Sequence, residues 1–504
     1  MKKQIYNPFL PLDEYIPDGE PHVFGDRVYL YGSHDQEGGT EYCMLDYVCY
    51  SAPVNDLTDW RFEGEIYKAV QDPDYTENAR MYAPDAVCGN DGRYYLYYHL
   101  QTAMGPSQPI SVAVCDEPAG KYEFHGYVKN SEGTRYTKYL TGDPGVINDD
   151  GVIRLYHGWS LSSIAAEAHG RSPEDIPEEF RSINQVDPKE RMIQAQMAFF
   201  KKTRDDIITP PGVMGANVVV LADDMLTVID GPHRIVPGEY EAQGTSFEGH
   251  AFYEASSIRK VDDIYYFIYS SQWSHELCYA TSRYPDRDFV YGGTIISNGD
   301  IGINGRERKD RLNMTANNHG SIEQINGQWY VFYHRQTHNS TFSRQACAER
   351  ITILPDGSIP QVEITSCGLN GGPLRAEGDY PAAIACNITN GNMPHITNRV
   401  LGADIPFVTH KNDERFITNI KDGTMIGFKY FAFTGATRLS VKTRDNGEGH
   451  FEVHIEGHIV GEIPINPSDT WQESGIEIDT TGEAGLLLNY FGTGSIDLLS
   501  ISMR

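Results

Sequence analysis

Short runs in which apolar and polar residues alternate dominate the chain, and Gly, Asn and Asp separate them. Runs of about four to eight such residues predict β-strands rather than helices. One pattern occurs five times: a polar lead residue, a short alternating strand, a tight turn with Gly or Asp, and an aromatic-rich strand. Each copy therefore predicts a β-hairpin. The copies are DGEPHVFGDRVYLYGSHD, APDAVCGNDGRYYLYYHL, DPGVINDDGVIRLYHGWS, EASSIRKVDDIYYFIYSS and HGSIEQINGQWYVFYHR.

The spacing of these hairpins predicts a five-bladed β-propeller over residues 1–372. The lead residues recur at intervals of about 60 residues, with one longer interval of about 110, which suits one four-stranded blade per repeat. The long interval contains residues 160–205, a partly helical pattern that we interpret as an insertion. The five lead residues are Asp18, Asp85, Asp143, Glu254 and His319.

The pattern changes from about residue 376. Short alternating strands such as RLSVKTR and GHFEVHIEG are separated by Gly, Asn and Asp, which is typical of an antiparallel β-sandwich. The glycine-rich stretch CGLNGG at 367–372 marks the boundary. We therefore expect an all-β protein with a second domain over 376–504.

Composition limits the partners of the chain. It carries 41 basic and 70 acidic residues, for a formal charge of −29. This charge argues against binding to nucleic acid or to an anionic membrane, and it is compatible with a neutral substrate. The sequence contains no apolar run long enough for a membrane helix and no apolar stretch after its first lysines, so we expect a cytoplasmic protein. None of the eight cysteines forms a CxxC pair, which predicts free thiols.

Convergence of the lead residues predicts a catalytic site. In a propeller the innermost strands start near the central axis, so these acids are expected to meet although they are far apart in sequence. Two carboxyls hydrolyse a glycosidic bond when one donates a proton and the other activates water. Glu254 follows Phe252 and Tyr253, surroundings that raise a carboxyl pKa, and it is the expected acid. Glu248 lies outside the repeat and is interpreted as a loop carboxylate.

The five hairpins together resemble glycoside hydrolase family 43, a family of five-bladed propellers. The resemblance implies that Asp18 in IPDGEPHVF is the general base, Asp143 in GDPGVINDDG the modulator of the acid's pKa, and Glu254 in EASSIRK the general acid. It also implies inversion of the anomeric centre. The family usually has Pro directly after the base, whereas this chain has Gly19, and Glu20 is the alternative base.

Other residues have two interpretations each. His319 in NNHGS matches a family histidine beside a central calcium ion, whereas the residue by itself predicts a hydrogen-bonded core histidine. Arg344 resembles a family arginine that reaches the substrate, the alternative being a surface ion pair. Asp85 either contacts sugar hydroxyls or caps a strand. Aromatic residues that either stack on sugar or pack between blades are Tyr82, Trp159 and Trp273.

The C-terminal stretch resembles a family 6 carbohydrate-binding module, which binds sugar on paired aromatic rings. Its candidates are Trp471, Tyr430, Phe431, Tyr490 and Phe491, for most of which a core position is expected. The domain is therefore interpreted as a structural partner that shapes the catalytic cleft.

The resemblance to family 43 implies an inverting, exo-acting glycoside hydrolase that removes α-L-arabinofuranosyl, and also β-D-xylosyl, residues from arabinoxylan-derived oligosaccharides. The alternatives are a β-D-xylosidase, an endo-arabinanase and a non-catalytic sugar-binding propeller. The loops expected to set the depth of the pocket are 33–47, 160–205 and 300–316.

Overall fold

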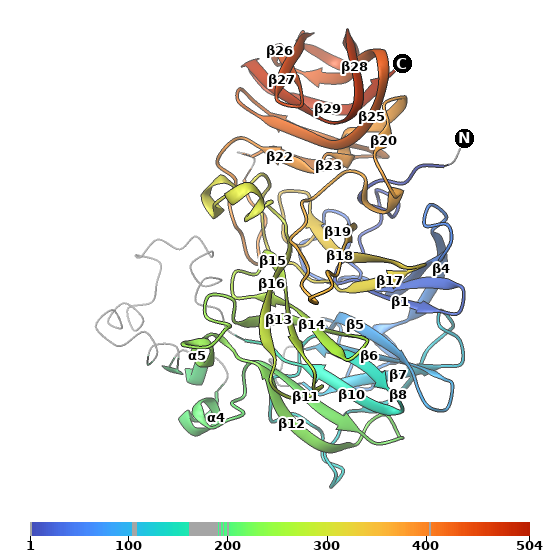
Figure 1. Ribbon diagram of the computed structural model, residues 1–504, viewed down its shortest axis with the longest axis vertical. Coiled ribbons are helices and arrows are strands. Elements are labelled where there is room, and N and C mark those ends of the chain that lie inside the picture. Colours follow the sequence, from blue (N-terminus) through green and yellow to red (C-terminus); the bar gives the residue numbers. More distant parts are fainter. Residues whose placement is uncertain are drawn as a thin grey trace.

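The computed structural model describes residues 3–102, 108–160, 190, 193–194, 196–198, 201–402 and 405–504. In Figure 1 the C-terminal sheet, orange to red, stands above five smaller sheets, and strands make up nearly all of the regular structure. The predicted all-β fold, a five-bladed propeller followed by an antiparallel β domain, is confirmed.

Each of the first four blades is an antiparallel sheet of four strands in chain order. Blade 1 contains β1 (Glu20–Phe24), β2 (Arg27–Tyr31), β3 (Tyr47–Pro53) and β4 (Arg61–Tyr67). Blade 2 contains β5 (Arg80–Cys88), β6 (Tyr94–Gln101), β7 (Ile110–Cys115) and β8 (Glu123–Tyr127). Blade 3 contains β9 (Gly145–Asp149), β10 (Val152–His157), β11 (Ala216–Leu221) and β12 (Val228–Val236). Blade 4 contains β13 (Phe252–Val261), β14 (Ile264–Ser271), β15 (Glu276–Ser282) and β16 (Val290–Ser297).

The N-terminal segment and blade 5 close the ring. Blade 5 has three described strands, β17 (Ile322–Ile325), β18 (Gln328–Gln336) and β19 (Arg344–Ile351). The backbone of Phe9 donates to Ala346 on β19 at 3.3 Å, and Asn7 Nδ2 donates to the carbonyl of Ala348 at 3.0 Å. Apolar residues of blades 1 and 5 and of this segment share one core cluster. The first residues of the chain therefore cover the outer edge of the last blade.

Inner strands of neighbouring blades approach closely at the axis. A Cβ atom on Gly145 would lie 2.6 Å from the carbonyl oxygen of Ser256, so a larger residue at 145 would push blades 3 and 4 apart. This close approach places the residues just before β9 beside those at the start of β13, which are Asp143 and Glu254.

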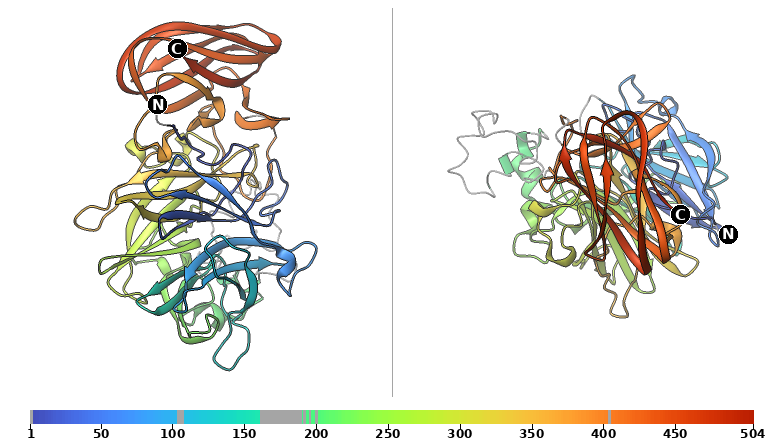
Figure 2. Two further views of the ribbon diagram at one scale, coloured as in Figure 1. Left: turned by 90° about the vertical axis from the view of Figure 1, so that its right-hand side faces the viewer. Right: turned by 90° about the horizontal axis from the view of Figure 1, so that it is seen from above.

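The C-terminal region forms a ten-stranded, mainly antiparallel sheet around one large apolar core. Its long strands β25 and β28 curve, so that the sheet folds over on itself in both views of Figure 2. Its strands are β20 (Leu374–Arg375), β21 (Gly378–Pro381), β22 (Asn387–Thr389), β23 (Phe407–Lys411), β24 (Glu414–Ile420), β25 (Met425–Asp445), β26 (Glu448–Ile455), β27 (His458–Ile465), β28 (Ser468–Thr493) and β29 (Ile496–Met503).

Helical structure is minor. The helices whose bounds are described are α4 (Arg204–Ile208) and α5 (Glu239–Ala242), and the described 3₁₀ turns are η1 (Ala69–Gln71), η3 (Ile303–Gly305), η4 (Arg308–Asp310), η5 (Gly368–Asn370) and η6 (Ala382–Ile384). Most of the insertion predicted at 160–205 lies outside the described residues, and α4 begins at its end. Among the described helices, none has the length and apolar character that a membrane span requires. All eight cysteines are free, as predicted.

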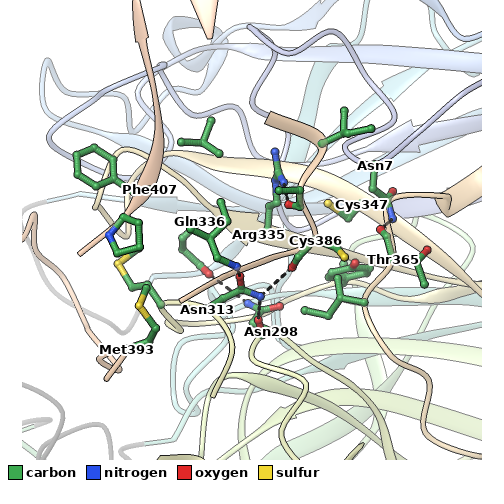
Figure 3. Close-up of a pocket in the computed structure, with 18 residues that line it drawn as sticks. Asn7, Asn298, Asn313, Arg335, Gln336, Cys347, Thr365, Cys386, Met393 and Phe407 are labelled. Atoms are coloured by element: carbon green, nitrogen blue, oxygen red, sulfur yellow. Dashed lines mark hydrogen bonds between the residues drawn. The ribbon is translucent and has the colours of Figure 1, made fainter. Parts of the chain in front are cut away.

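The propeller and the C-terminal region meet in a polar junction (Figure 3). Asn313 Nδ2 donates to the carbonyl of Cys386 at 3.0 Å, and Arg335 Nη1 donates to that of Ala385 at 3.0 Å. A cavity of about 50 Å³ lies here, lined by residues of both regions, with room for a few water molecules. The lining of this cavity does not include the predicted catalytic carboxyls, so the cavity is distinct from the predicted catalytic site.

Candidate active site

The lead residues turn into their strands through left-handed backbone conformations. Asp18 has φ of 58° and Asp143 has φ of 46°, and each precedes the inner strand of its blade. In blade 4 the residue after Glu254, Ala255, has φ of 71° within an irregular part of β13. Left-handed φ values are uncommon for residues other than Gly, Asn and Asp and cluster at functional sites. Here they set the direction of the acidic side chains.

Asp18, Asp143 and His319 meet at the axis. Nδ1 of His319 lies 3.7 Å from Asp18 Oδ1 and 3.9 Å from Asp143 Oδ2. Asp143 Oδ2 in turn accepts a hydrogen bond from the backbone of Ala255 at 2.9 Å, which ties it to the residue after Glu254. The structure therefore brings together four of the five predicted lead residues.

Asp18 is buried and bound by an arginine. Arg344 Nη1 lies 2.9 Å from Asp18 Oδ1 and 3.2 Å from Oδ2, and His334 Nδ1 accepts from the backbone of Asp18 at 3.3 Å. Burial alone would raise the pKa of Asp18, but the Arg344 charge, followed by the hydrogen bond with His334, holds that pKa well below its usual range. Asp18 is thus ionised at neutral pH, which is the protonation state that a general base requires.

Glu254 has the opposite character. Burial and then the neighbouring charge of Asp143 raise the pKa of Glu254 to about 8, and a 3.1 Å hydrogen bond from Trp159 Nε1 offsets part of this shift. Its side chain is only half-buried. A carboxyl that stays protonated at neutral pH and remains accessible can donate a proton to a leaving group.

Asp143 lies between the two. Burial raises its pKa, His319 opposes that shift, and the charge of Asp18 adds to it. Because its own charge raises the pKa of Glu254, its position agrees with the predicted role of modulator. The distances and charges support the three predicted roles, which stay predictions until variants are assayed.

Of the two interpretations of Asp85, the structure agrees with the one in which it caps a strand. Its carboxylate is fully buried, and it accepts from the backbone of Val146 and Ala86 at 2.7 Å each while His22 Nε2 lies 2.5 Å away. Both oxygens are used inside the protein, so it holds strands together and does not contact sugar. The alternative base Glu20 lies beside Asp85, and Ser257 Oγ donates to it at 3.0 Å.

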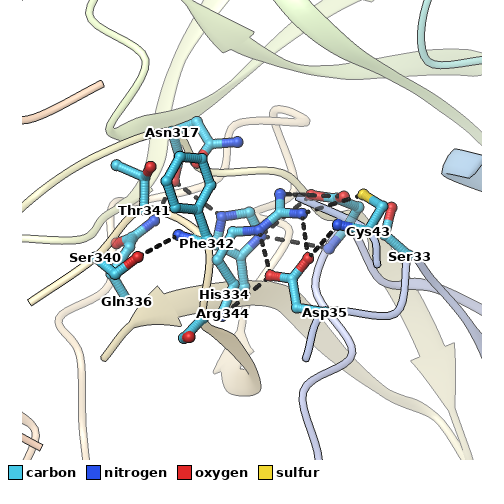
Figure 4. A network of polar contacts seen from close by, with 12 residues as sticks. Ser33, Asp35, Cys43, Asn317, His334, Gln336, Ser340, Thr341, Phe342 and Arg344 are labelled. Atoms are coloured by element: carbon cyan, nitrogen blue, oxygen red, sulfur yellow. Dashed lines mark hydrogen bonds and ion pairs between the residues drawn. The ribbon is translucent and has the colours of Figure 1, made fainter. Parts of the chain in front are cut away.

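Arg344 also differs from both of its interpretations. It is neither a surface residue nor open to substrate, because it is only 2% exposed. Its guanidinium bridges Asp18 and Asp35, with Nε 2.8 Å from Asp35 Oδ2 and Nη2 3.0 Å from Oδ1 (Figure 4). Asp35 and His334 were not singled out from sequence. The available signal was a His or Asp at the end of the second strand of several hairpins, as in GSHD and FYHR.

Tyr42 is a second residue that the sequence did not single out. Its half-buried ring lies under the Arg344 guanidinium, 4.7 Å from centroid to Cζ, and packs edge-on against Phe342 at 4.8 Å. Burial raises the pKa of its hydroxyl, and the charge of Glu254 also contributes. Tyr42 therefore lies beside Arg344 and close enough to the predicted acid to feel its charge.

The remaining predicted aromatics lie at different places. Tyr82 is half-buried, and the charges of Arg344 and Asp35 influence its hydroxyl, so it is placed to line the site. Trp159 contacts Glu254 directly. Trp273 donates from Nε1 to the carbonyl of Gly249 at 2.7 Å, and Arg308 covers its ring at 3.2 Å, so only part of that ring is free to stack.

Glu248 is exposed and accepts from Gly244 in its own loop at 3.0 Å, which agrees with its interpretation as a loop carboxylate.

Calcium at His319 was tested against the surrounding side chains. Calcium takes six to eight oxygen ligands. In the described part of the chain, none of the clusters of three metal-ligating groups includes His319, and Asp18 is already bound by Arg344. These residues do not form an oxygen cage around His319, so calcium stays a prediction, which dialysis against a chelator followed by add-back would test.

The C-terminal aromatics are mostly engaged within the protein. Phe431 and Tyr490 are fully buried, and the hydroxyl of Tyr430 donates to Glu363. Trp471 donates from Nε1 to Glu414 at 3.0 Å, and Arg444 covers its ring at 4.1 Å. Phe491 is 39% exposed. The expected core positions are thus found for Phe431 and Tyr490, and the likeness to a carbohydrate-binding module is not confirmed.

Comparison with known proteins agrees with this geometry. The sequence profile described as "Glycosyl hydrolases family 43" matches residues 5–171. A "Xylosidase/arabinosidase" of Thermoclostridium stercorarium is 43% identical over 521 residues, covering 100% of this chain and 99% of that protein. "Xylosidase/arabinosidase 43A" of Humicola insolens is 28% identical over 335 residues, covering 64% of this chain and 88% of that protein. The crystal structure of a GH43_1 enzyme from Xanthomonas citri complexed with xylotriose has the same fold, with a TM-score of 0.50, 23% identity and coverage of 71% of this chain and 94% of that one.

Proposed function

Because this chain belongs to glycosyl hydrolases family 43, we propose that it is an exo-acting enzyme that releases α-L-arabinofuranosyl, and also β-D-xylosyl, residues from arabinoxylan-derived oligosaccharides. One observation carries the chemistry: two carboxyls in one site have pKa values that the protein drives in opposite directions. The pKa of Asp18 is held low by Arg344, and that of Glu254 is raised to about 8. Such a pair assigns base and acid.

The proposed reaction is a single displacement at the anomeric carbon. Asp18 takes a proton from water as the water oxygen bonds to the anomeric carbon. The bond from that carbon to the leaving oxygen breaks, and Glu254 gives this oxygen its proton. Water enters from the face opposite the leaving group, so the product has inverted configuration.

The choice of sugar rests on the relatives. The Thermoclostridium and Humicola proteins carry names for both xylosidase and arabinosidase activity. The formal charge of −29 is compatible with a neutral oligosaccharide. A β-D-xylosidase as the main activity is the second candidate, supported by the same two names.

The test is hydrolysis of two aryl glycosides, the α-L-arabinofuranoside and the β-D-xylopyranoside, by the wild-type protein and by Glu254→Gln. We expect turnover of at least one glycoside, with the larger kcat/KM naming the preferred sugar. Proton NMR during the reaction is expected to show the inverted anomer first. Retention of configuration, or turnover of neither glycoside, would contradict the proposal.

Release of single sugars from arabinoxylan oligosaccharides separates exo from endo action. Arabinose or xylose as the first product supports an exo-enzyme, whereas longer fragments from linear arabinan would favour an endo-arabinanase.

A further inference from the structure

Two loops of the propeller border the Arg344–Asp18 pair, and both are held by the C-terminal region. The first loop, residues 32–46, connects β2 to β3 and carries Asp35 and Tyr42. The second, residues 337–343, connects β18 to β19 and carries Phe342. Gly38 donates from its backbone to Ser343 Oγ at 3.0 Å, so the two loops also contact each other.

The second loop is bound mainly through its backbone. His338 donates to the carbonyl of Val408 at 2.8 Å, and Thr341 donates to that of Arg399 at 3.1 Å. Leu401 donates back to Asn339 at 2.9 Å. These bonds attach the C-terminal segment along this loop, directly before Arg344.

The first loop is held by a side-chain contact. Arg415 on β24 approaches Glu37 through two nitrogens, with Nη2 2.7 Å from Oε2 and Nε 3.2 Å from Oε1. The pair is largely buried, at 15% and 14% side-chain exposure. Tyr15 also donates to Glu37 Oε1 at 3.2 Å. A two-point arginine–carboxylate contact removed from water fixes geometry better than an exposed ion pair does.

Two histidines complete this cluster. His338 Nε2 and His410 Nδ1 lie 2.8 Å apart, and His410 Nδ1 lies 3.4 Å from Glu37 Oε1. Glu37, His338 and His410 have the composition of a metal site. However, the carboxylate is already occupied by Arg415 and the two rings are hydrogen-bonded to each other. The arrangement therefore works as a hydrogen-bonded clamp between the two regions.

We propose that the Glu37–Arg415 pair is a positioning contact for catalysis, through which the C-terminal sheet fixes the loop that presents Asp35 and Tyr42 to Arg344. The inference rests on the proposed function. Only one residue separates Glu37 from Asp35, and Asp35 holds the same guanidinium that binds Asp18. A loosened loop would leave Arg344 less well placed, and small misplacements near reacting groups cost activity.

The experiment compares Arg415→Met with Arg444→Met. Arg444 is a matched control because it pairs with Asp497 inside the C-terminal sheet at 2.9 Å, with similar exposures of 18% and 10%. The rate of hydrogen exchange at residues 33–43 measures how firmly the clamp holds the first loop, independently of enzymatic activity. We expect faster exchange there in Arg415→Met and not in Arg444→Met. Unchanged exchange would overturn the proposal.

Steady-state kinetics measure how the loss of the Glu37–Arg415 contact affects catalysis. We expect Arg415→Met to lower kcat/KM on the preferred aryl glycoside about 10-fold. Glu37→Gln and the double variant should lose about as much as the single one, since all three remove the same contact. Arg415→Lys should recover part of the activity. Additive losses, or faster exchange with unchanged activity, would overturn the proposal.

The pH profile separates positioning from general destabilisation. The charged or titratable groups around Asp18 are Arg344, Asp35, Cys43, Tyr47, His334, His319, Asp143 and Glu254. With Arg344 less fixed, the acidic limb of kcat/KM should move to higher pH in Arg415→Met, and it should stay in place in Arg444→Met. A wild-type protein that hydrolyses neither glycoside would refute the proposed function and the catalytic role together, while the exchange data would still report whether the clamp exists.

Discussion

Two layers of acidic residues lie along the propeller axis, and they differ in what they can do. The upper layer contains Asp18, Asp143 and Glu254, and the lower contains Glu20 and Asp85. In each layer burial and a neighbouring aspartate raise the pKa of a glutamate to about 8. A raised pKa therefore does not by itself distinguish a catalytic acid from a structural one.

The two glutamates, Glu254 and Glu20, differ in their exposure to solvent and in the side chains that bind them. Glu254 is half-buried and has Trp159 as its side-chain partner, so a leaving-group oxygen can approach it. Glu20 is 1% exposed and is bound by Ser257 and by Arg259, whose Nη2 lies 3.2 Å away. In the lower layer, partners within the protein occupy the carboxyl of Glu20. In the upper layer, the carboxyl of Glu254 remains accessible.

Asp18→Asn should show the largest effect. The variant removes the base and leaves Arg344 without its full counter-charge, so kcat/KM should fall about 10³–10⁴-fold on any glycoside, whatever its leaving group. Steady-state kinetics with aryl glycosides of different leaving-group acidity measure this. A loss that depends on the leaving group would mean that Asp18 is not the base.

Glu254→Gln should cost about 10²–10³-fold on oligosaccharides and much less on glycosides with acidic phenol leaving groups, because these depart without protonation. The alkaline limb of kcat/KM should also disappear, since in the wild type it reports the deprotonation of Glu254 near pH 8. Equal losses on both substrate types would argue against the acid role.

Trp159→Phe tests how the hydrogen bond from Trp159 affects the pKa of Glu254. Its Nε1 bond to Glu254 favours the ionised carboxylate and so lowers the pKa. Losing that bond should shift the alkaline limb to higher pH, with only a few-fold change in kcat. An unchanged limb in the pH profile would show that this hydrogen bond does not tune the acid.

Glu20→Gln should have the smallest effect on activity, less than about 2-fold, because its carboxyl is sealed in the lower layer. The substitution should instead change the stability of the fold. The folded-state pKa of Glu20, about 8, lies above the unfolded value near 4.3, so the stability contributed by the neutral form is complete below about pH 4.3 and is lost as pH rises through about 8.

Thermal unfolding between pH 5 and 9 measures this contribution. The decline in Tm with rising pH should be shallower in Glu20→Gln than in the wild type. A large loss of activity in the variant would instead restore Glu20 as a candidate base.

The sequence predicted most of the upper layer because its residues occur at the same position in successive repeats. Asp18, Asp143, Glu254 and His319 each open an inner hairpin, and the ring symmetry brings them to the axis. Asp85 does not occupy the position of Asp18 and Asp143 in its blade, because the left-handed residue of blade 2 is Ala83, two residues earlier. Asp85 therefore lies beside Glu20 in the lower layer, where it caps a strand, as one of its two interpretations expected.

What the sequence determined by itself was local and periodic: the strands, the turns, the number of blades and the acids at their starts. These follow from side-chain alternation and turn chemistry, which act over a few residues. The tertiary structure alone decided the Arg344–Asp35–Asp18 bridge, the Trp159–Glu254 bond and the Glu37–Arg415 contact. Each joins residues from different blades or regions, and no short-range pattern encodes which distant charge will neutralise a given carboxylate once both are removed from water.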